Sequence, residues 1–358
     1  MRMKKLMLFA AMAAIAVSCA KTSEVNPVSE QAIGFDTWTD NLTKSTHLDF
    51  PDGAKFDVYG FKQAGTTKTT VFDGDDVTKD GAAWNYAQIR SWDRATDSYT
   101  FFAISPANIT TTEPSPAQTG LFVTNDITFT GKNNDVLISK RKEVLKKDYG
   151  TEVHLVFLPK ASLFDLKVKK AKNLKEAELK INSVSIKNIK TSGHLTVTGY
   201  EDDDTPNISW ALAATPTTAN FNNHSGITSV DFPVIIEKSV EHGIDHSEFL
   251  INNLVVMPQT LDNGESGQQL EINYSVTFSG ETLTHTRTIQ LNKFDNTDMK
   301  GEGRDEIDQN GETGSAYITT WDPGKHYTYY LTINADLIVF SAEISNWTDV
   351  NAFHYIID

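Results

Sequence analysis

Cys19 is the residue whose position points most clearly to chemistry. It is the single cysteine among 358 residues, and it follows Ala16-Val17-Ser18 at the end of an apolar run from Leu6 to Val17. A basic start, a short apolar stretch and small residues before the cleavage point are typical of a signal peptide. We therefore predict a signal peptide over residues 1–18 and acylation of the Cys19 thiol. An ordinary secretory signal that ends near a cysteine is the alternative.

Three acidic clusters could provide oxygen ligands for a hard cation such as Ca²⁺. They span Asp73–Asp76, Glu201–Asp204 and Asp305–Glu312. The last of them resembles the first half of a calcium loop, but the closing glutamate would fall at Tyr317, which cannot serve. Solvated turns explain all three clusters better. The sequence therefore predicts no metal site and no cofactor.

Motifs for enzymatic catalysis are missing from the sequence. It has no GxSxG, HExxH, P-loop or GxGxxG pattern. His242, Asp245 and His246 stand together, but Gly243 lies between them and strand-like segments flank them, which favours an exposed loop over a metal site. Two carboxylates from distant segments could still form a glycosidase pair, but no motif points to one. We predict that the protein is not an enzyme.

The charge balance limits the possible partners. The formal net charge is −15, so binding to nucleic acid through phosphate contacts is not expected. No apolar segment after the first is long enough to cross a membrane, so any attachment is through lipid. With one cysteine there is no disulfide framework, and a packed core must hold the chain together.

The elements that must position these residues are strands. Polarity alternates along Lys55–Phe61, Ser98–Phe102 and Leu270–Phe278, a pattern that predicts strands with one buried face. Clusters such as Asp73-Gly74-Asp75-Asp76 separate them as turns. Helical composition is confined to two short segments, Lys140–Lys147 and Lys170–Lys180. The fold class is therefore predicted to be all-β, with β-sandwich domains.

A weak internal repeat supports two domains. Trp92-Asp93 precedes Tyr99-Thr100-Phe101-Phe102, and Trp321-Asp322 precedes Tyr327-Thr328-Tyr329-Tyr330 at nearly the same spacing. Chance similarity between aromatic strands is the alternative. We predict domains over residues 19–150 and 151–358, with the boundary after Asp148-Tyr149-Gly150.

Several short motifs in this order resemble the fimbrillin family, the subunits of lipoprotein-derived (type V) pili. The resemblance extends over nearly all of the mature chain. The segments that carry it are Cys19, Ile33–Trp38, Thr43-Lys44, Phe56–Phe61, Tyr99–Ala103 with Pro106, Val255–Gln259, and Trp321–Tyr329 followed by Ile344 and Trp347.

The resemblance implies two transthyretin-like β-sandwich domains in tandem and assembly by strand exchange. A lipidated precursor reaches the outer membrane, a trypsin-like protease cuts an early loop, and the first strand leaves. The matching cut falls between Lys44 and Ser45, where the family usually has Arg. A protease strictly specific for Arg would not accept Lys44. The alternative is that Lys44 is an ordinary loop lysine.

The partners implied are other pilus subunits, which add a strand to the opened groove by β-augmentation. The C-terminal tail is the candidate donor, because Phe353, Tyr355 and Ile357 would share one face of a strand. The tail could instead be the last strand of its own domain.

From these inferences we predict that the protein is a structural fimbrial subunit, located at the cell outer membrane and surface, that serves adhesion. The alternative is an outer-membrane glycan-binding lipoprotein, in which exposed aromatic residues such as Trp38, Trp84 or Trp210 stack on sugars.

Overall fold

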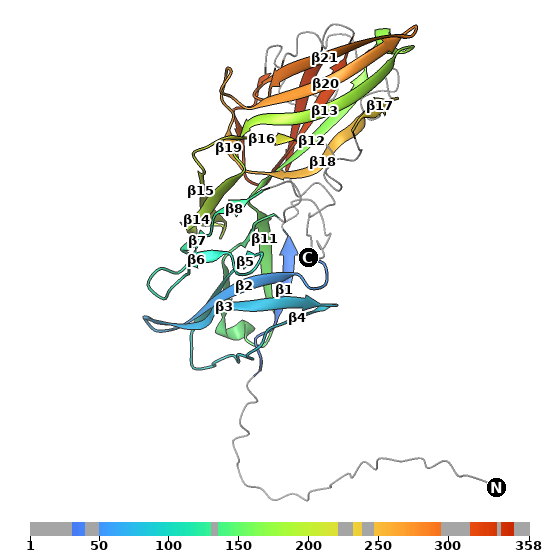
Figure 1. The fold of residues 1–358 in the computed structure, drawn as a ribbon. Coiled ribbons are helices and arrows are strands. Elements are labelled where there is room, and N and C mark those ends of the chain that lie inside the picture. The colour runs from blue at the N-terminus through green and yellow to red at the C-terminus, as the bar shows by residue number, and fades with distance from the viewer. Residues whose placement is uncertain are drawn as a thin grey trace, which may run out of the picture.

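The computed structural model describes residues 31–39, 50–129, 135–220, 232–237, 247–294, 316–334 and 338–346. In these ranges the protein is all-β, as predicted, and it forms four larger sheets and two strand pairs. Figure 1 shows two β bodies, one formed mainly by the first half of the chain and one by the second. No helix in the described ranges is long and apolar enough to cross a membrane.

The largest sheet belongs to the first half of the chain and has eight strands. In order across the sheet they are β1 (Phe35–Thr39), β11 (Val153–Pro159), β9 (Leu137–Ser139), β5 (Ser98–Ser105), β2 (Lys55–Ala64), β3 (Thr67–Asp80) and β4 (Ala83–Asn85), with β10 (Lys142–Leu145) also paired to β5. Both faces of this sheet are covered. Phe56 and Val58 of β2 point into one core, whereas Tyr59 and Phe61 point into another. The prediction of a single buried face for Lys55–Phe61 is therefore wrong.

A five-stranded sheet covers one of these faces. Its strands are β15 (Pro206–Leu212), β14 (Ser192–Tyr200), β7 (Phe122–Thr124) and β6 (Thr110–Thr112), with β8 (Ile127–Thr128) paired to β14. The β14–β15 hairpin comes from the second half of the chain, yet β14 pairs with β7 and β8 of the first half. The chain thus passes position 150 and returns to the first body twice, as β11 and as this hairpin. Separate folding of residues 19–150 and 151–358 stays a prediction.

The second body is a sandwich of two sheets around one apolar core. One sheet contains β18 (Glu248–Val256), β12 (Ser162–Lys170), β25 (Lys325–Ile333) and β26 (Ile338–Asn346), and the other contains β16 (Thr217–Asn220), β13 (Glu178–Ile189), β20 (Gln269–Phe278) and β21 (Glu281–Gln290), with β17 (Val234–Ile236) also paired to β13. Along β20 the buried side chains of Leu270, Ile272 and Tyr274 alternate with partly exposed polar side chains, which confirms the predicted half-buried strand.

The remaining elements are short. They are the strand pairs β19 (Gln259–Thr260) with β24 (Thr320–Trp321) and β22 (Lys293–Phe294) with β23 (Ala316–Tyr317), and the 3-10 turns η1 (Lys146–Asp148) and η2 (Lys172–Leu174). The two segments of helical composition, 140–147 and 170–180, thus form only short 3-10 turns and parts of strands. Pairing of β10 with β5 overrides the helical composition of the first segment.

The internal repeat has a structural counterpart. The backbone N–H of Asp93 donates a hydrogen bond to the Tyr99 hydroxyl at 2.7 Å, and that of Asp322 donates to the Tyr327 hydroxyl at 2.7 Å. The preceding tryptophans, Trp92 and Trp321, are buried in separate cores. The two Trp-Asp turns are thus locally equivalent, as the sequence predicted.

A buried carboxyl lies where the two bodies meet. The backbone N–H of Ala161 donates to Asp135 Oδ1 at 3.0 Å, and Trp210 Nε1 donates to the Lys160 carbonyl at 2.8 Å. Burial raises the pKa of Asp135 to about 8 and lowers the pKa of Lys160 to about 8. Asp135 is therefore largely protonated at neutral pH.

This burial predicts a pH effect on stability. The folded pKa of Asp135 lies above its unfolded value of 3.8, so the folded state retains a proton that the unfolded state loses, and stability falls as pH rises between these values. Asp135→Asn keeps an oxygen acceptor for Ala161 without titrating. We expect it to raise the melting temperature at pH 8 and to leave it nearly unchanged at pH 4, measured by circular dichroism. An equal shift at both pH values would contradict this account.

Candidate functional site

Strand β1 occupies one edge of the eight-stranded sheet. It runs parallel to β11, with Phe35 opposite Val153 and Thr39 opposite Phe157. Within the described ranges β11 is the only strand with which β1 forms a ladder. Figure 1 shows β1 as the blue strand beside β11. An edge strand with one neighbour can leave a sheet without breaking any other strand pair.

The side chains of this segment nevertheless fill part of the core. Ile33, Phe35 and Thr37 alternate along it and are all buried. Phe35 is 4 % exposed, and its ring contacts four other rings, with centroid distances of 5.3–6.3 Å: Phe56, Phe72, Tyr86 and Phe101. All four contacts are edge-to-face, an arrangement that aromatic pairs favour. Withdrawal of β1 would therefore leave a space with an aromatic lining.

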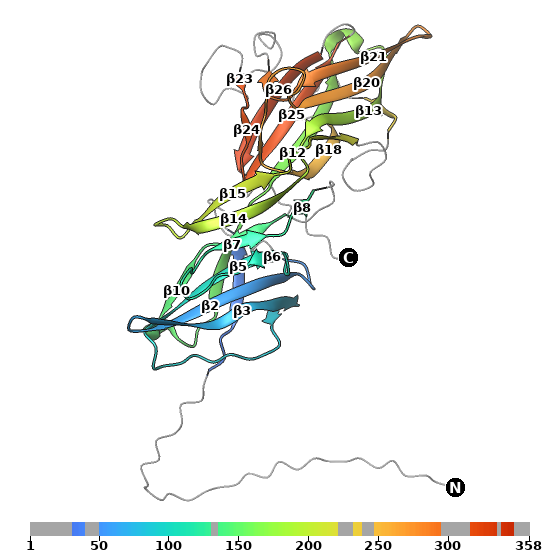
Figure 2. The ribbon, with the colours of Figure 1, turned by 60° about the vertical axis from the view of Figure 1, so that its left-hand side comes forward.

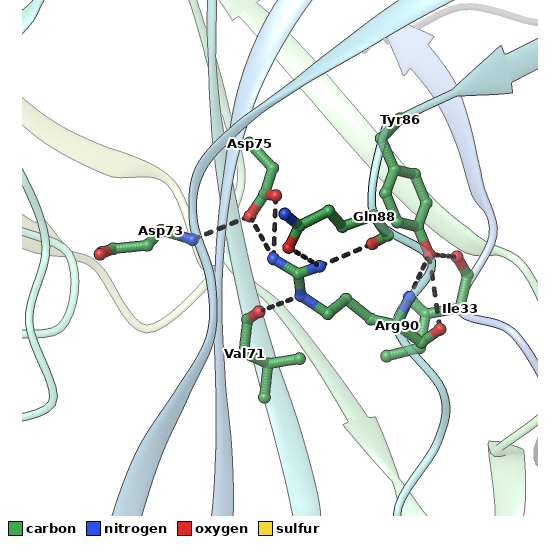
Figure 3. Close-up of polar contacts among 7 residues, drawn as sticks. All are labelled: Ile33, Val71, Asp73, Asp75, Tyr86, Gln88 and Arg90. Atoms are coloured by element: carbon green, nitrogen blue, oxygen red, sulfur yellow. Dashed lines mark hydrogen bonds and ion pairs between the residues drawn. The ribbon is translucent and has the colours of Figure 1, made fainter.

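The residues just before β1 are held by the segment that follows β4. The Ile33 N–H donates to the Arg90 carbonyl at 2.8 Å, and the Trp92 N–H donates to the Gln31 carbonyl at 3.0 Å. The Tyr86 hydroxyl donates to the Ile33 carbonyl at 2.7 Å (Figure 3). Burial raises the pKa of Tyr86, which keeps its hydroxyl protonated as a donor.

Arg90 fixes that segment to β3. Its Nε donates to the Val71 carbonyl at 2.9 Å, and its Nη2 lies 3.0 Å from Asp75 Oδ1 (Figure 3). Its Nη1 donates to the Gln88 carbonyl at 2.7 Å. A guanidinium with several acceptors is rigidly placed. Arg90 thus holds segment 86–92 in the position from which it forms its hydrogen bonds with Gln31 and Ile33.

A polar pair joins β1 to β11 on the outer face. Asp36 lies opposite His154 in the parallel register, and His154 Nδ1 is 3.1 Å from Asp36 Oδ2. Both side chains are partly exposed, so the pair adds little to stability. It marks a site where the two strands approach each other at the surface.

The residues predicted for processing and donation lie outside the described ranges. These are Cys19, Lys44, Ser45, Phe353, Tyr355 and Ile357. In chain order Lys44 and Ser45 stand between the end of β1 at Thr39 and the next described residue, Phe50. Their roles stay predictions.

The sequence marks Ile33–Trp38 as a segment that carries the family resemblance, but it does not mark Tyr86, Arg90 or His154. No local pattern marks these three, because their roles depend on contacts between residues that are 15 to 118 positions apart.

The two acidic clusters within the described ranges are engaged in other contacts. Asp75 pairs with Arg90, and Asp204 pairs with Arg141 at 2.6 Å. Asp203 lies 3.7 Å from Lys140. Among the described residues, no three His, Cys, Asp or Glu side chains form a group that could hold a metal ion. The 305–312 cluster and the 242–246 histidines lie outside those ranges.

Two of the aromatic residues considered for sugar stacking pack against the cores. Trp84 contacts the rings of Phe50 and Phe56 at 5.4 and 4.9 Å. Trp210 packs against Phe129, with its Nε1 bound to a carbonyl. Both side chains are half-buried and pack against the cores of the first body. The side chain of Trp38 lies outside what the structure describes.

Comparison with known proteins identifies the family. A family model described as fimbrillin-like matches residues 43–347. The chain belongs to the fimbrillin-like family. This is a family of fimbrial proteins and not of enzymes, and it implies a place at the cell surface among other pilus subunits.

One of the similar solved structures, a fimbrial protein, supports the fold of this fimbrillin-like chain. A fimbrial protein from Bacteroides vulgatus is 16 % identical, with a TM-score of 0.59, and the match covers 88 % of this chain and 99 % of the other. A candidate cell adhesion protein from Bacteroides uniformis is 13 % identical, with a TM-score of 0.45, over 88 % of this chain and 99 % of its own. No curated protein sequence matches.

Proposed function

We propose that this fimbrillin-like protein is a structural fimbrial subunit that is exported as a lipoprotein acylated at Cys19 and assembled by strand exchange. In this proposal each body is a transthyretin-like sandwich, and the acylated precursor is held at the outer membrane. A trypsin-like protease cuts between Lys44 and Ser45 and so releases β1. Another subunit then supplies the missing strand.

The observation that carries the proposal is the position of β1. It is an edge strand with buried side chains, and in the chain it precedes the proposed cut, whereas β2 and every later strand follow it. Cleavage after Lys44 would leave β1 without a covalent link to the rest of its sheet. It would then be retained by non-covalent contacts: its ladder with β11, the Asp36–His154 pair, the hydrogen bonds to 86–92 and Gly150, and the packing of its buried side chains.

Loss of β1 would leave unpaired backbone groups and an uncovered apolar surface, and a second strand could restore both contacts. The outer backbone groups of β11 would lose their partners, and the space lined by the rings around Phe35 would open to water. A donated strand satisfies both, since it supplies hydrogen bonds and alternate apolar side chains. Phe353, Tyr355 and Ile357 have the same two-residue spacing as Ile33, Phe35 and Thr37.

Anchoring is tested by one substitution. Cys19→Ser removes the thiol that carries the acyl chains, so the exported protein should move from the membrane fraction to the soluble fraction. Buried lipid chains hold a protein at a membrane through the hydrophobic effect, and their loss removes that attachment. Cell fractionation with immunoblotting measures the change. A Cys19→Ser protein that stays membrane-bound would refute lipidation as the anchor.

Processing is tested by limited proteolysis. Trypsin should cut the purified precursor first after Lys44, because proteolysis favours exposed connecting segments over paired strands. Lys55 is a matched control, since it lies in β2 opposite Thr78 of β3. Lys44→Gln should remove the first cut and the SDS-resistant ladder of assembled subunits together. A first cut within 140–147, or normal ladders from Lys44→Gln, would count against this processing site.

A further inference from the structure

Strand β21 is a long, exposed edge in the second body. It has ten residues and pairs within the described ranges only with β20. Leu283 is 65 % exposed, and Phe278 across the turn is 60 % exposed. Figures 1 and 2 show the β20–β21 turn at the end of the second body farthest from the first body.

Proline, lysine and a bulge, which often prevent edge pairing, are missing from β21, whose charged residues are Glu281 and Arg287. Natural edge strands are kept short, or carry proline, inward lysine or a bulge. The edge strands β4 and β6 have three residues each, and β15 begins at Pro206. In contrast, β21 has no proline or lysine, and its register with β20 runs without a shift from Phe278–Glu281 to Gln269–Gln290.

The turn defines which backbone groups of β21 point outward. Ser279 and Gly280 have φ values of 54° and 85°, as a two-residue type I′ turn requires. In such a hairpin the flanking residues, Phe278 and Glu281, form a hydrogen-bonded pair, and such pairs alternate along the ladder. The N–H and C=O groups of Thr282, Thr284, Thr286 and Thr288 therefore point away from β20.

These outward groups are compatible with a second copy of the same strand. If a two-fold axis relates two β21 strands, the strands run antiparallel. Because the outward backbone groups are those of the threonines, each of these threonines must lie opposite a threonine of the other copy. Centred on Thr284, the register places Glu281 of each copy opposite Arg287 of the other, and Thr282 opposite Thr286. Neighbouring two-fold registers lack this opposition of charges. Opposite charges facing each other across a strand pair are stabilising.

The side chains of β21 also fit this register. The threonine side chains share one face with Ser275 and Thr277 of β20, and that face already carries cross-strand hydroxyl contacts, at 3.0 Å for Ser275 to Thr284 and 2.8 Å for Thr277 to Thr282. Pairing would continue this polar ladder into the second copy. On the opposite face Leu283 would lie beside His285 of the other copy and lose its exposure.

We propose that β21 is a self-complementary docking edge through which two copies of this chain pair side by side, centred on Thr284. The contact is small compared with the roughly 1,200–2,000 Å² of a standard interface, so a single pair dissociates readily. Subunits aligned in two fibres would make many such contacts at once, which favours lateral bundling by avidity. Bundling depends on the proposed fimbrial role, but the pairing itself does not.

Disulfide trapping tests the register in the full-length, uncleaved Cys19→Ser protein, which has no other cysteine. Thr284→Cys should give a covalent dimer on mild oxidation, because hydrogen-bonded partners lie about 5.5 Å apart between Cα atoms, within disulfide range. Thr286→Cys is the matched control, since its own copy would lie about 13 Å away along the strand. Equal crosslinking of the two variants, or none for Thr284→Cys, would overturn the proposal.

Sedimentation velocity at 0.15 M salt tests the contact without cysteine. Thr284→Pro should weaken association at least tenfold, because it removes an outward N–H, a position where edge strands tolerate proline. Glu281→Arg and Arg287→Glu should each weaken it, and the double reversal should restore it. A protein that is monomeric at every concentration, or single reversals without effect, would refute the pairing. Both tests use uncleaved protein, so they can fail or succeed independently of fibre assembly.

Discussion

A disulfide between the positions of Asp36 and His154 is expected to abolish fibre assembly while leaving cleavage after Lys44 intact. The two residues are direct partners in the β1–β11 register, and their side chains meet at 3.1 Å on the outer face. Neighbouring strands lie about 4.8 Å apart, within the range of Cα separations that disulfides span. The Asp36→Cys/His154→Cys double variant would therefore hold β1 in place after the cut.

The measurement compares SDS-resistant ladders with and without reductant after protease treatment. The oxidised double variant should be cleaved after Lys44 but should form no SDS-resistant ladder. Reduction of its disulfide should restore the ladder to the level of the parent protein. Each single variant is a control and should assemble under both conditions. Ladders of normal intensity from the oxidised double variant would mean that β1 does not leave during assembly.

Phe35→Ala is expected to destabilise the uncleaved protein by about 3–5 kcal/mol, as for other buried aromatic truncations. The reason is the loss of packing against the four rings around Phe35. In assembled subunits the same substitution should have no effect on stability, because the strand that carries Phe35 has gone. Denaturant unfolding of precursor and of assembled fibres measures the two states.

Trp321→Ala is the matched control for this comparison. Trp321 is 1 % exposed, packs against Phe164 and donates from Nε1 to the Tyr329 hydroxyl at 3.0 Å. Its core belongs to the second body, which the proposed cut leaves complete. Its truncation should therefore destabilise precursor and fibre alike. If Phe35→Ala also weakens both states, β1 remains in the assembled subunit.

Some features of this protein follow from local sequence. The signal peptide pattern ending at Cys19 depends only on neighbouring residues. The alternation along Leu270–Phe278 predicts a half-buried strand because side chains of a strand point alternately to its two faces, and the structure confirms it. The Trp-Asp turns at 92 and 321 also form locally, since each Tyr hydroxyl accepts from an Asp N–H five or six residues away.

Other features arise only when distant segments meet. The parallel pairing of β1 with β11 joins residues 118 apart, and nothing in either strand names the other as its partner. Return of the β14–β15 hairpin to the first body, and two-sided burial of β2, likewise depend on which sheets stack. Local sequence predicted the strands at Lys55–Phe61, Ser98–Phe102 and Leu270–Phe278, because strand propensity and alternation depend on neighbouring residues, but it did not predict the strand β10. Only the tertiary structure shows that, within the described ranges, β1 is an edge strand, because an edge is defined by the partners that a strand lacks.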